Sequence, residues 1–206
     1  MNRRELIRLI ALTTGSVVIG GEFLLSGCKN EHASNTISFT PDDIAFLDEV
    51  AETIIPKTNT PGAKDAAVGS FMAMMVTDCY ESNDQNAFYK GISQIDDACN
   101  KKFSIAFMKA SPEQRQQLLT ETDKEAKLYQ QQKADKEKDL REQAKRERNK
   151  KFAFAANHYY TMMKQLTILG YFTSKPGATE ALRYVAVPGR WEACIPYKKG
   201  DKAWAI

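Results

Sequence analysis

The stretch TPDDIAFLDEVAETIIP, residues 40–56, indicates the fold class of the chain. Thr40 stands at an N-cap position, Pro41 follows at the first helical position, and two acids fill the first turn, a combination that predicts a helix start. Five apolar side chains then fall on one face at helical spacing: Ile44, Leu47, Ala51, Ile54 and Ile55. Pro56 ends this pattern, so the sequence predicts an amphipathic helix between Thr40 and Pro56.

Further helices follow the same reasoning. The sequence predicts them over 66–81, over 85–101, from the cap Ser111-Pro112-Glu113-Gln114 onward, and over 152–169. The 66–81 segment is apolar nearly all round, which is typical of a central core helix. Its residues Phe71, Met72, Met74 and Met75 are interpreted as core packing rather than as the lining of a cofactor site. Strand signals are nearly absent, so we predict an all-α small helical bundle, with a single domain over 39–206.

Two segments depart from this pattern. Residues 121–151 are almost entirely charged or Gln, with acids and bases alternating as on a solvated helix with i,i+4 pairs. This predicts a long charged helical insertion, either solvent-facing or poorly ordered, in preference to an arm that grips a partner. After Gly170 the composition shifts to Gly, Pro and aromatic residues, which predicts an extended, irregular C-terminal tail over 170–206.

The N-terminus has the features of an export signal. Arg3, Arg4, Leu6 and Ile7 resemble the twin-arginine signal, R-R-x-[F/L]-[L/I]-[K/R], which serves proteins that cross the membrane already folded. The apolar run at 9–25 is interrupted and shorter than the about 20 residues of a spanning helix.

The apolar run ends in LLSGC, which resembles a lipobox whose cysteine, Cys28, becomes lipidated. We therefore expect a signal peptide at 1–27 and a lipid-attached tether at 28–38. The protein would be a membrane-anchored lipoprotein on the periplasmic side. The alternative is an uncleaved anchor with an incidental cysteine.

The composition and motifs of the sequence do not indicate catalysis, or the binding of a cofactor, a metal or nucleic acid, by this chain. The formal net charge of +3 is near balance, which argues against nucleic acid as a partner. There is no phosphate-binding loop and no C-x-x-C-H haem motif. His32 and His158 lack a second ligand at metal-binding spacing, and His158, on the helix predicted over 152–169, is interpreted as a boundary residue rather than as a metal ligand. Adjacent acids at 42–43 and 96–97 point to different parts of a helix surface. No catalytic, cofactor-binding or metal-ligating residue is nominated.

Two long runs carry a resemblance to a known family. They are FTPDDIAFLDEVAETIIPKTNTPGA (39–63) and LTILGYFTSKPGATEALRYVAVPGRWEACIPYKKGDKAWA (166–205), with Ile55-Pro56, Thr60-Pro61-Gly62, Gly170-Tyr171-Phe172, Pro176-Gly177 and Pro188-Gly189-Arg190 in order. The chain resembles the gluconate 2-dehydrogenase subunit 3 family, the small subunits of membrane-bound flavin-dependent sugar dehydrogenases.

The resemblance implies a non-catalytic subunit without its own cofactor. Its partner would be a large FAD-containing catalytic subunit of the glucose-methanol-choline (GMC) oxidoreductase class, with a cytochrome or other electron carrier beside it. The small subunit would assist twin-arginine export, assembly and membrane anchoring of that partner. The competing interpretation is a stand-alone helical lipoprotein that acts as a binding or scaffold module.

The tail holds the residues expected at a partner interface. They are Tyr171, Phe172, Pro188, Gly189, Arg190, Trp191, Cys194 and Trp204, with further aromatics at Tyr184 and Tyr197. Aromatic anchors of this kind are typical of interfaces. The alternative, that these aromatics fold back on the bundle, stays open.

The cysteines outside the export signal differ in their expected roles. Cys79 and Cys99 are expected about 15 Å apart along a helical hairpin at 1.5 Å per residue, beyond the about 7 Å between Cα atoms that a disulfide spans. Both are therefore predicted to be buried apolar groups. For Cys194, the resemblance implies a possible disulfide to the catalytic subunit.

Overall fold

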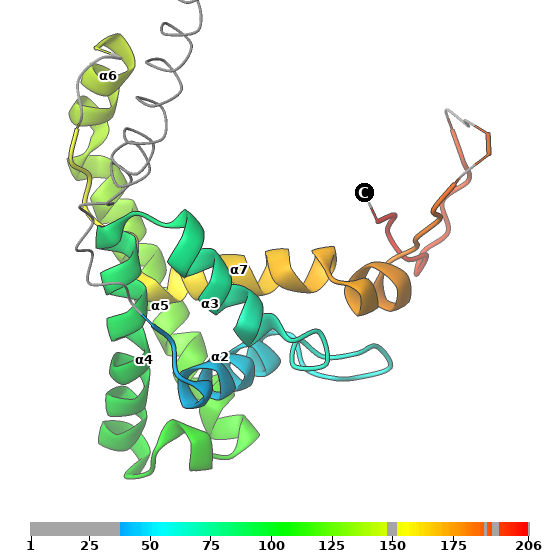
Figure 1. Ribbon diagram of the computed structural model, residues 1–206, viewed down its shortest axis with the longest axis horizontal. Coiled ribbons are helices and arrows are strands. Elements are labelled where there is room, and N and C mark those ends of the chain that lie inside the picture. The colour runs from blue at the N-terminus through cyan, green and yellow to red at the C-terminus, as the bar shows by residue number, and fades with distance from the viewer. Residues whose placement is uncertain (1–37, 148–151, 188, 191–193, 206) are drawn as a thin grey trace, which may run out of the picture. The chain divides into compact units, whose positions relative to one another are not determined.

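A computed structural model describes residues 38–147, 152–187, 189–190 and 194–205. The expected export signal at Arg3, Arg4, Leu6 and Ile7 and the lipidation site Cys28 lie outside the described residues, as do Pro188 and Trp191. The tether predicted over 28–38 also lies outside them, except for its last residue. The helices are α2 (Pro41–Ile54), α3 (Val68–Cys79), α4 (Ser82–Phe103), α5 (Pro112–Lys136), α6 (Lys138–Arg146) and α7 (Tyr159–Thr173), with the short helices η2 (Phe107–Lys109) and η3 (Gly177–Ala181) (Figure 1). The described part contains no strand, so the predicted all-α fold is confirmed.

Both predicted helix caps are present. In α2 the Thr40 hydroxyl accepts from the Asp43 amide at 3.2 Å, and the Asp43 carboxylate accepts from the Thr40 amide at 2.9 Å. In α5 the reciprocal pair is Ser111 and Gln114, at 3.3 and 2.9 Å. Each capping box satisfies two amides at a helix start, which explains why these helices begin where the sequence indicates.

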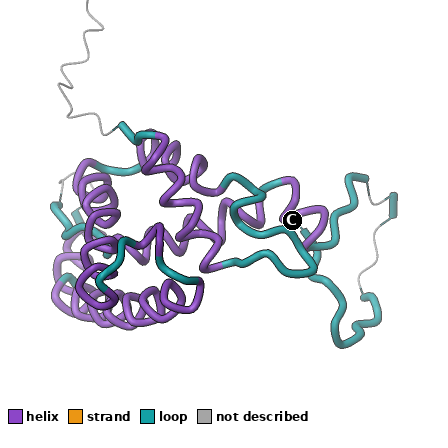
Figure 2. The backbone as a smooth tube through the Cα atoms, turned by 90° about the horizontal axis from the view of Figure 1, so that it is seen from below, coloured by secondary structure: helices purple, strands orange, loops and turns teal. Residues whose placement is uncertain are grey.

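Helix α7 is the central element of the bundle. It packs against α2, α3, α4 and α5, and Met162, Met163 and Leu166 lie fully inside the core. Figures 1 and 2 show α7 crossing the other helices and carrying η3 and the C-terminal residues beyond α4 and α5. Two glycines allow the close contacts, because a Cβ on Gly91 of α4 would meet Tyr159, and one on Gly170 would meet Phe71 of α3.

The helix predicted over 152–169 begins later and ends later than expected. Residues 152–158 are not helical, because side chains of other helices bond to their backbone. Asp84 accepts from the Asn157 amide at 2.6 Å, and Glu137 accepts from the Ala155 amide at 2.7 Å. Those amides are therefore unavailable for helical bonds. At its other end α7 runs to Thr173, and η3 follows, so the irregular tail starts at 182 rather than at 170.

The charged region is helical, as predicted, and it has an inner face. Helix α5 extends through its first half and buries Thr122 and Ala126, while Asp123 forms a 2.7 Å ion pair with Lys164 of α7. Lys133 and Glu137 are 8% and 7% exposed, unusually low for charged side chains. The charge content of the sequence does not reveal this face, because its buried positions are Thr122, Ala126 and Lys133 rather than large apolar residues.

Two expectations about the core need correction. Met72 is fully buried and Phe71 and Met75 are half-buried, but Met74 is 53% exposed. Cys99 is buried, whereas Cys79, the last residue of α3, is exposed. Within the described residues, Cys79, Cys99 and Cys194 are free.

Candidate functional site

The C-terminal residues form a loop that is closed at its base. The Arg183 amide donates to the Ala203 carbonyl at 2.8 Å, and the Ala205 amide donates to the Arg183 carbonyl at 2.9 Å. The Arg183 guanidinium also lies 4.7 Å from the centre of the Trp204 ring, a cation–π contact. We call the described residues between 184 and 203, namely 184–187, 189–190 and 194–203, the C-terminal loop.

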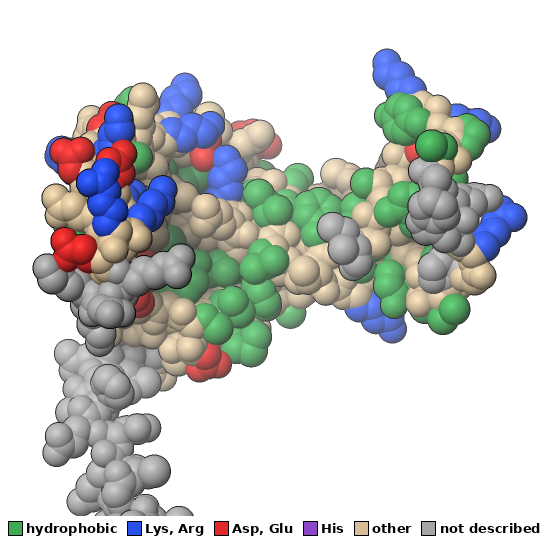
Figure 3. Space-filling view, turned by 90° about the horizontal axis from the view of Figure 1, so that it is seen from above, with side chains coloured by type: hydrophobic (Ala, Val, Ile, Leu, Met, Phe, Trp, Pro, Cys, Tyr) green, Lys and Arg blue, Asp and Glu red, His purple; other side chains and the backbone are tan. Residues whose placement is uncertain are grey.

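Exposed apolar side chains concentrate on the C-terminal half of α7 and on this loop. Spacings of three and four residues put Ile168, Leu169 and Phe172 together on the outside of α7. We define the docking surface as these three residues together with Tyr184, Val185, Val187, Ile195, Tyr197 and Trp204, all between 40% and 82% exposed. Figure 3 shows hydrophobic side chains along the part of the surface that joins the bundle to the C-terminal loop. A large exposed apolar surface is typical of a protein or membrane contact.

The residues predicted at a partner interface fall into two groups. Phe172 is 40% and Trp204 50% exposed, and Gly189, Arg190 and Cys194 are also exposed. Tyr171 is different, because it is 2% exposed and its hydroxyl donates to the Pro61 carbonyl at 2.6 Å. The assignment of Tyr171 to the interface is wrong.

Helix geometry explains this error and the residues that were missed. Since α7 continues to Thr173, the neighbours Tyr171 and Phe172 point to different faces of the helix. The same continuation exposes Ile168 and Leu169, which the sequence analysis did not nominate. The signal that could have found them is the run of apolar residues at 166–172, which is too wide for one buried face.

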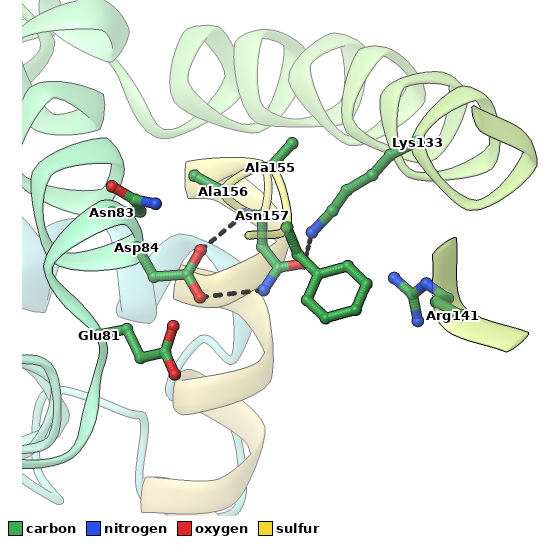
Figure 4. Close-up of a pocket in the computed structure, with 9 residues that line it drawn as sticks. Glu81, Asn83, Asp84, Lys133, Arg141, Ala155, Ala156 and Asn157 are labelled. Carbon is green, nitrogen blue, oxygen red and sulfur yellow. Dashed lines mark hydrogen bonds between the residues drawn. The ribbon is translucent and has the colours of Figure 1, made fainter. Parts of the chain in front are cut away.

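A second candidate site is a polar groove between α4 and α5. Its first compartment is a cavity of about 340 Å³ whose lining includes Glu81, Asn83, Lys133 and Arg141. Figure 4 shows Asp84 joined to Asn157 by two hydrogen bonds, and Lys133 reaching Asn157 from the opposite side. The Lys133 ammonium donates to the Asn157 side-chain oxygen at 2.9 Å. Asn157 thus forms the centre of the floor, held from both helices.

Glu137 does not line this compartment, but it binds the segment that forms the floor. It accepts from the Ala155 amide at 2.7 Å and from Arg141 at 3.0 Å. Burial by itself raises the pKa of Glu137, but the hydrogen bonds from Ala155 and Arg141, with the charge of Lys133, outweigh it and lower the pKa below its ordinary value. Glu137 is therefore a carboxylate at neutral pH, and it holds the floor segment against α5 and α6.

The second compartment, a cavity of about 570 Å³, adjoins the first and shares Asn83, Ala156 and Asn157 with it. Its lining adds Lys90 and Gln94 of α4, Glu125 and Tyr129 of α5, and His158 and Tyr159. We call the two compartments together the α4–α5 groove.

His158 lies at the N-cap of α7, whereas the helix predicted over 152–169 placed it in the helix interior. Its Nδ1 accepts from the Tyr160 amide at 3.2 Å at the start of α7, and its ring stacks on Tyr159 at 4.4 Å. Burial lowers the pKa of His158, although the charge of Glu125 acts against this. The neutral ring, with Nδ1 as acceptor, carries its proton on Nε2.

Two further searches of the described residues bear on function. No group of three or more His, Cys, Asp or Glu side chains in this part of the chain is placed to hold a metal ion. Among the described helices, none combines the length and the hydrophobicity that crossing a bilayer requires.

These features define an all-α protein with a large exposed apolar surface. Residues 41–189, more than half of the chain, match the family described as gluconate 2-dehydrogenase subunit 3, and the chain belongs to that family. The resemblance stated from the two sequence runs is thereby confirmed. No curated protein and no solved structure matches the chain.

Proposed function

We propose that this chain is the non-catalytic small subunit of a flavin-dependent sugar or sugar-acid dehydrogenase complex. The proposal rests on family membership, and the structural observation that carries it is the docking surface. The partner in this proposal is an FAD-containing catalytic subunit of the GMC class, with a cytochrome or other electron carrier beside it. The flavin belongs to that partner, and this chain supplies contact area.

Two features of the docking surface suit a binding role. Burying a fully exposed apolar side chain gains about 1.5–3 kcal/mol, and each side chain of the docking surface, 40–82% exposed, can gain the part of this that corresponds to its exposed area. A few such side chains can supply most of an interface energy. The contacts between Arg183 and residues 203–205 also close the C-terminal loop before any partner binds. A loop that is already closed loses less conformational entropy on association.

The proposal includes the route of export. Arg3, Arg4, Leu6 and Ile7 would direct the chain to the twin-arginine pathway, and the folded, flavin-loaded partner would cross while bound to it. After export, lipid on Cys28 would hold the complex on the periplasmic side of a membrane, because bacterial lipoproteins carry more than one acyl chain and two or more chains anchor stably. The folding of a flavoprotein in the cytoplasm would explain why a chain without a cofactor has such a signal.

Purification from membranes of the native host tests the assembly. A tagged full-length chain should bring down a flavoprotein, identified by its flavin absorbance and by mass spectrometry. Leu169→Ser in the docking surface should lower its recovery by about five- to thirtyfold, as expected for the loss of 1–2 kcal/mol. Leu128→Ser is the matched control, because Leu128 is also an exposed helical leucine, 60% against 47%, and lies on α5. Equal recovery from both variants would contradict the assignment of the surface.

Export is tested separately. Changing Arg3 and Arg4 to Lys should leave both this chain and the flavoprotein in the cytoplasm, as shown by cell fractionation. If the flavoprotein still reaches the periplasm while this chain does not, the escort role is excluded although the complex itself can exist.

The disulfide part of the proposal concerns Cys194. Its thiol is exposed and free in the described structure, so it can reach a partner. A non-reducing gel of the purified complex should show a band of the combined mass that Cys194→Ser removes. Cys79→Ser is the control, since Cys79 is also exposed, and it should leave the band unchanged. Identical bands in all three samples would exclude the bridge.

A further inference from the structure

We propose that the α4–α5 groove binds a neutral carbohydrate chain of several sugar units. This inference concerns a face of the molecule built from α4, α5 and the segment 154–159, and it does not depend on the docking surface or on the proposed function. It follows from the unpaired polar groups of the groove, its balance of charge, its aromatic rings and its length.

The first argument is the number of polar side chains without a partner. Asn83, Lys90 and Gln94 of α4 face the cavities, as does Glu125 of α5. All four side chains are exposed, and within the described part of the chain none of them forms a hydrogen bond or ion pair, so each can contact a ligand. They comprise two amides, an ammonium and a carboxylate. Vicinal sugar hydroxyls both donate and accept, so they can pair with all of these groups.

The second argument is that the charges of the groove cancel. Lys90, Lys133 and Arg141 are matched by three carboxylates, those of Glu81, Asp84 and Glu125. A groove of this kind has no net attraction for a polyanion such as nucleic acid or for a polycation, because each sign is present beside the other. Dense polar groups without net charge favour a neutral ligand that is rich in hydroxyls.

The third argument is the aromatic content of the floor and walls. Phe154 and Tyr159 lie on the floor segment, and Tyr129 projects from α5, where its hydroxyl is fixed by a 3.0 Å hydrogen bond to the Ala156 carbonyl. Tyr159 is held by its contact with Gly91, and its ring stacks on His158. The CH faces of sugar rings are apolar and pack on such rings, whose orientation is set in advance.

The fourth argument is length. Asn83 and Gln94 are eleven positions apart on one face of α4, which at 1.5 Å per residue corresponds to about 16 Å. The two compartments share Asn83, Ala156 and Asn157, so they are neighbours along α4 over this distance. A monosaccharide would fill only one compartment, and a chain of linked sugars can occupy both.

The groove has a rigid base. Lys133 and Asp84 hold Asn157 from opposite sides, and Glu137 holds Ala155. Since these groups already have partners, they form the base, while the unpaired groups on α4 and α5 are left to bind. This division of roles identifies which substitutions remove contacts with a ligand without removing the support of the groove.

The test is a titration of the full-length chain with chitotetraose, cellotetraose and maltotetraose, three neutral four-sugar chains. Isothermal calorimetry measures affinity, and ¹H–¹⁵N NMR locates the perturbed amides. At least one of the three should bind saturably and shift the resonances of residues 83–94 and 154–159. The double variant Lys90→Ala, Gln94→Ala should weaken that binding about tenfold, since two hydrogen bonds are lost.

The matched control is Lys101→Ala, Gln131→Ala, which changes the same residue types at equally exposed positions of α4 and α5 that lie outside the groove. It should bind within twofold of the unchanged chain. No saturable binding of any of the three chains would overturn the proposal, as would equal weakening by the groove and control variants. Shifts of the groove resonances by a penta-serine peptide but not by the sugars would also overturn it, because the groove would then be a peptide site.

Discussion

The hydroxyl of Tyr171 donates a 2.6 Å hydrogen bond to the carbonyl oxygen of Pro61, and this bond joins α7 to the loop that follows α2. The same loop is fixed from its other side by Glu52, whose carboxylate accepts from the Lys57 and Lys64 amides at 2.8 and 2.9 Å. Pro61 and Tyr171 belong to the two sequence runs that carry the family resemblance. These runs are far apart in the sequence and meet in the fold.

Tyr171→Phe should lower the free energy of unfolding by about 0.5–1.5 kcal/mol, because it removes one hydrogen bond and keeps the ring in the core. Urea denaturation of the full-length chain measures this. Recovery of the flavoprotein partner should not change, since Tyr171 is 2% exposed. If Tyr171→Phe lowered the recovery of the partner without changing stability, Tyr171 would have to contact the partner, contrary to its burial in the structure.

Local sequence signals were sufficient to predict where α2 and α5 begin. The boxes at Thr40 and Ser111 depend on residues three positions apart, so both could be predicted from short windows. The start of α7 could not be predicted in this way. It depends on Asp84 and Glu137, which lie 73 and 18 positions from the amides that they bind. Helical periodicity over 152–169 contains no information about those distant acceptors.

The candidate sites likewise differ in whether local sequence or distant packing determines them. Aromatic content indicated that the tail is an interface candidate, and Phe172 and Trp204 are indeed exposed. The α4–α5 groove was not predicted, because its polar residues read as ordinary solvated faces of two separate helices. Only the packing of α4 and α5 on the segment 154–159 makes a concave site from them.

Gly91→Ala should destabilise the protein, although alanine is the better helix former. A Cβ at this position would lie 2.5 Å from both Cβ and Cγ of Tyr159. The helix-propensity gain of about 1 kcal/mol is smaller than the about 1–3 kcal/mol expected for overpacking, so we expect a net loss that thermal or urea denaturation detects. Ser93→Ala, an exposed change two positions away on α4, should have a small effect of the opposite sign. Stabilisation by Gly91→Ala would show that α4 and α7 can separate without cost.

Glu137→Gln should make stability less dependent on pH. The pKa of Glu137 is lower in the folded protein than its ordinary value of 4.5, so the unfolded chain binds the proton more readily. The carboxylate therefore stabilises the fold above about pH 4.5, and this contribution disappears as the pH falls through the folded-state pKa.

Denaturation at a series of pH values tests this relation. Glu137→Gln should be less stable than the unchanged chain at pH 7, and the difference should shrink below about pH 4.5. Glu142→Gln, an exposed substitution on α6, is the control and should follow the unchanged chain. A constant difference between Glu137→Gln and the unchanged chain at all pH values would mean that packing, rather than the carboxylate charge, is what the substitution removes.

Arg183→Ala should loosen the base of the C-terminal loop. The substitution removes the cation–π contact with Trp204, worth about 0.5–1 kcal/mol at an exposed site. It also removes a 3.8 Å ion pair with Asp201, which adds little because both side chains are more than a third exposed, and it keeps the two backbone hydrogen bonds. We expect amide hydrogen exchange at Ala205 to accelerate by about two- to fivefold, since exchange follows the free energy of local opening. Lys199→Ala, an exposed change within the loop, should leave the rate unchanged. Unchanged exchange in Arg183→Ala would mean that the backbone bonds alone close the loop, and preorganisation by the Trp204 contact would then play no part in binding a partner.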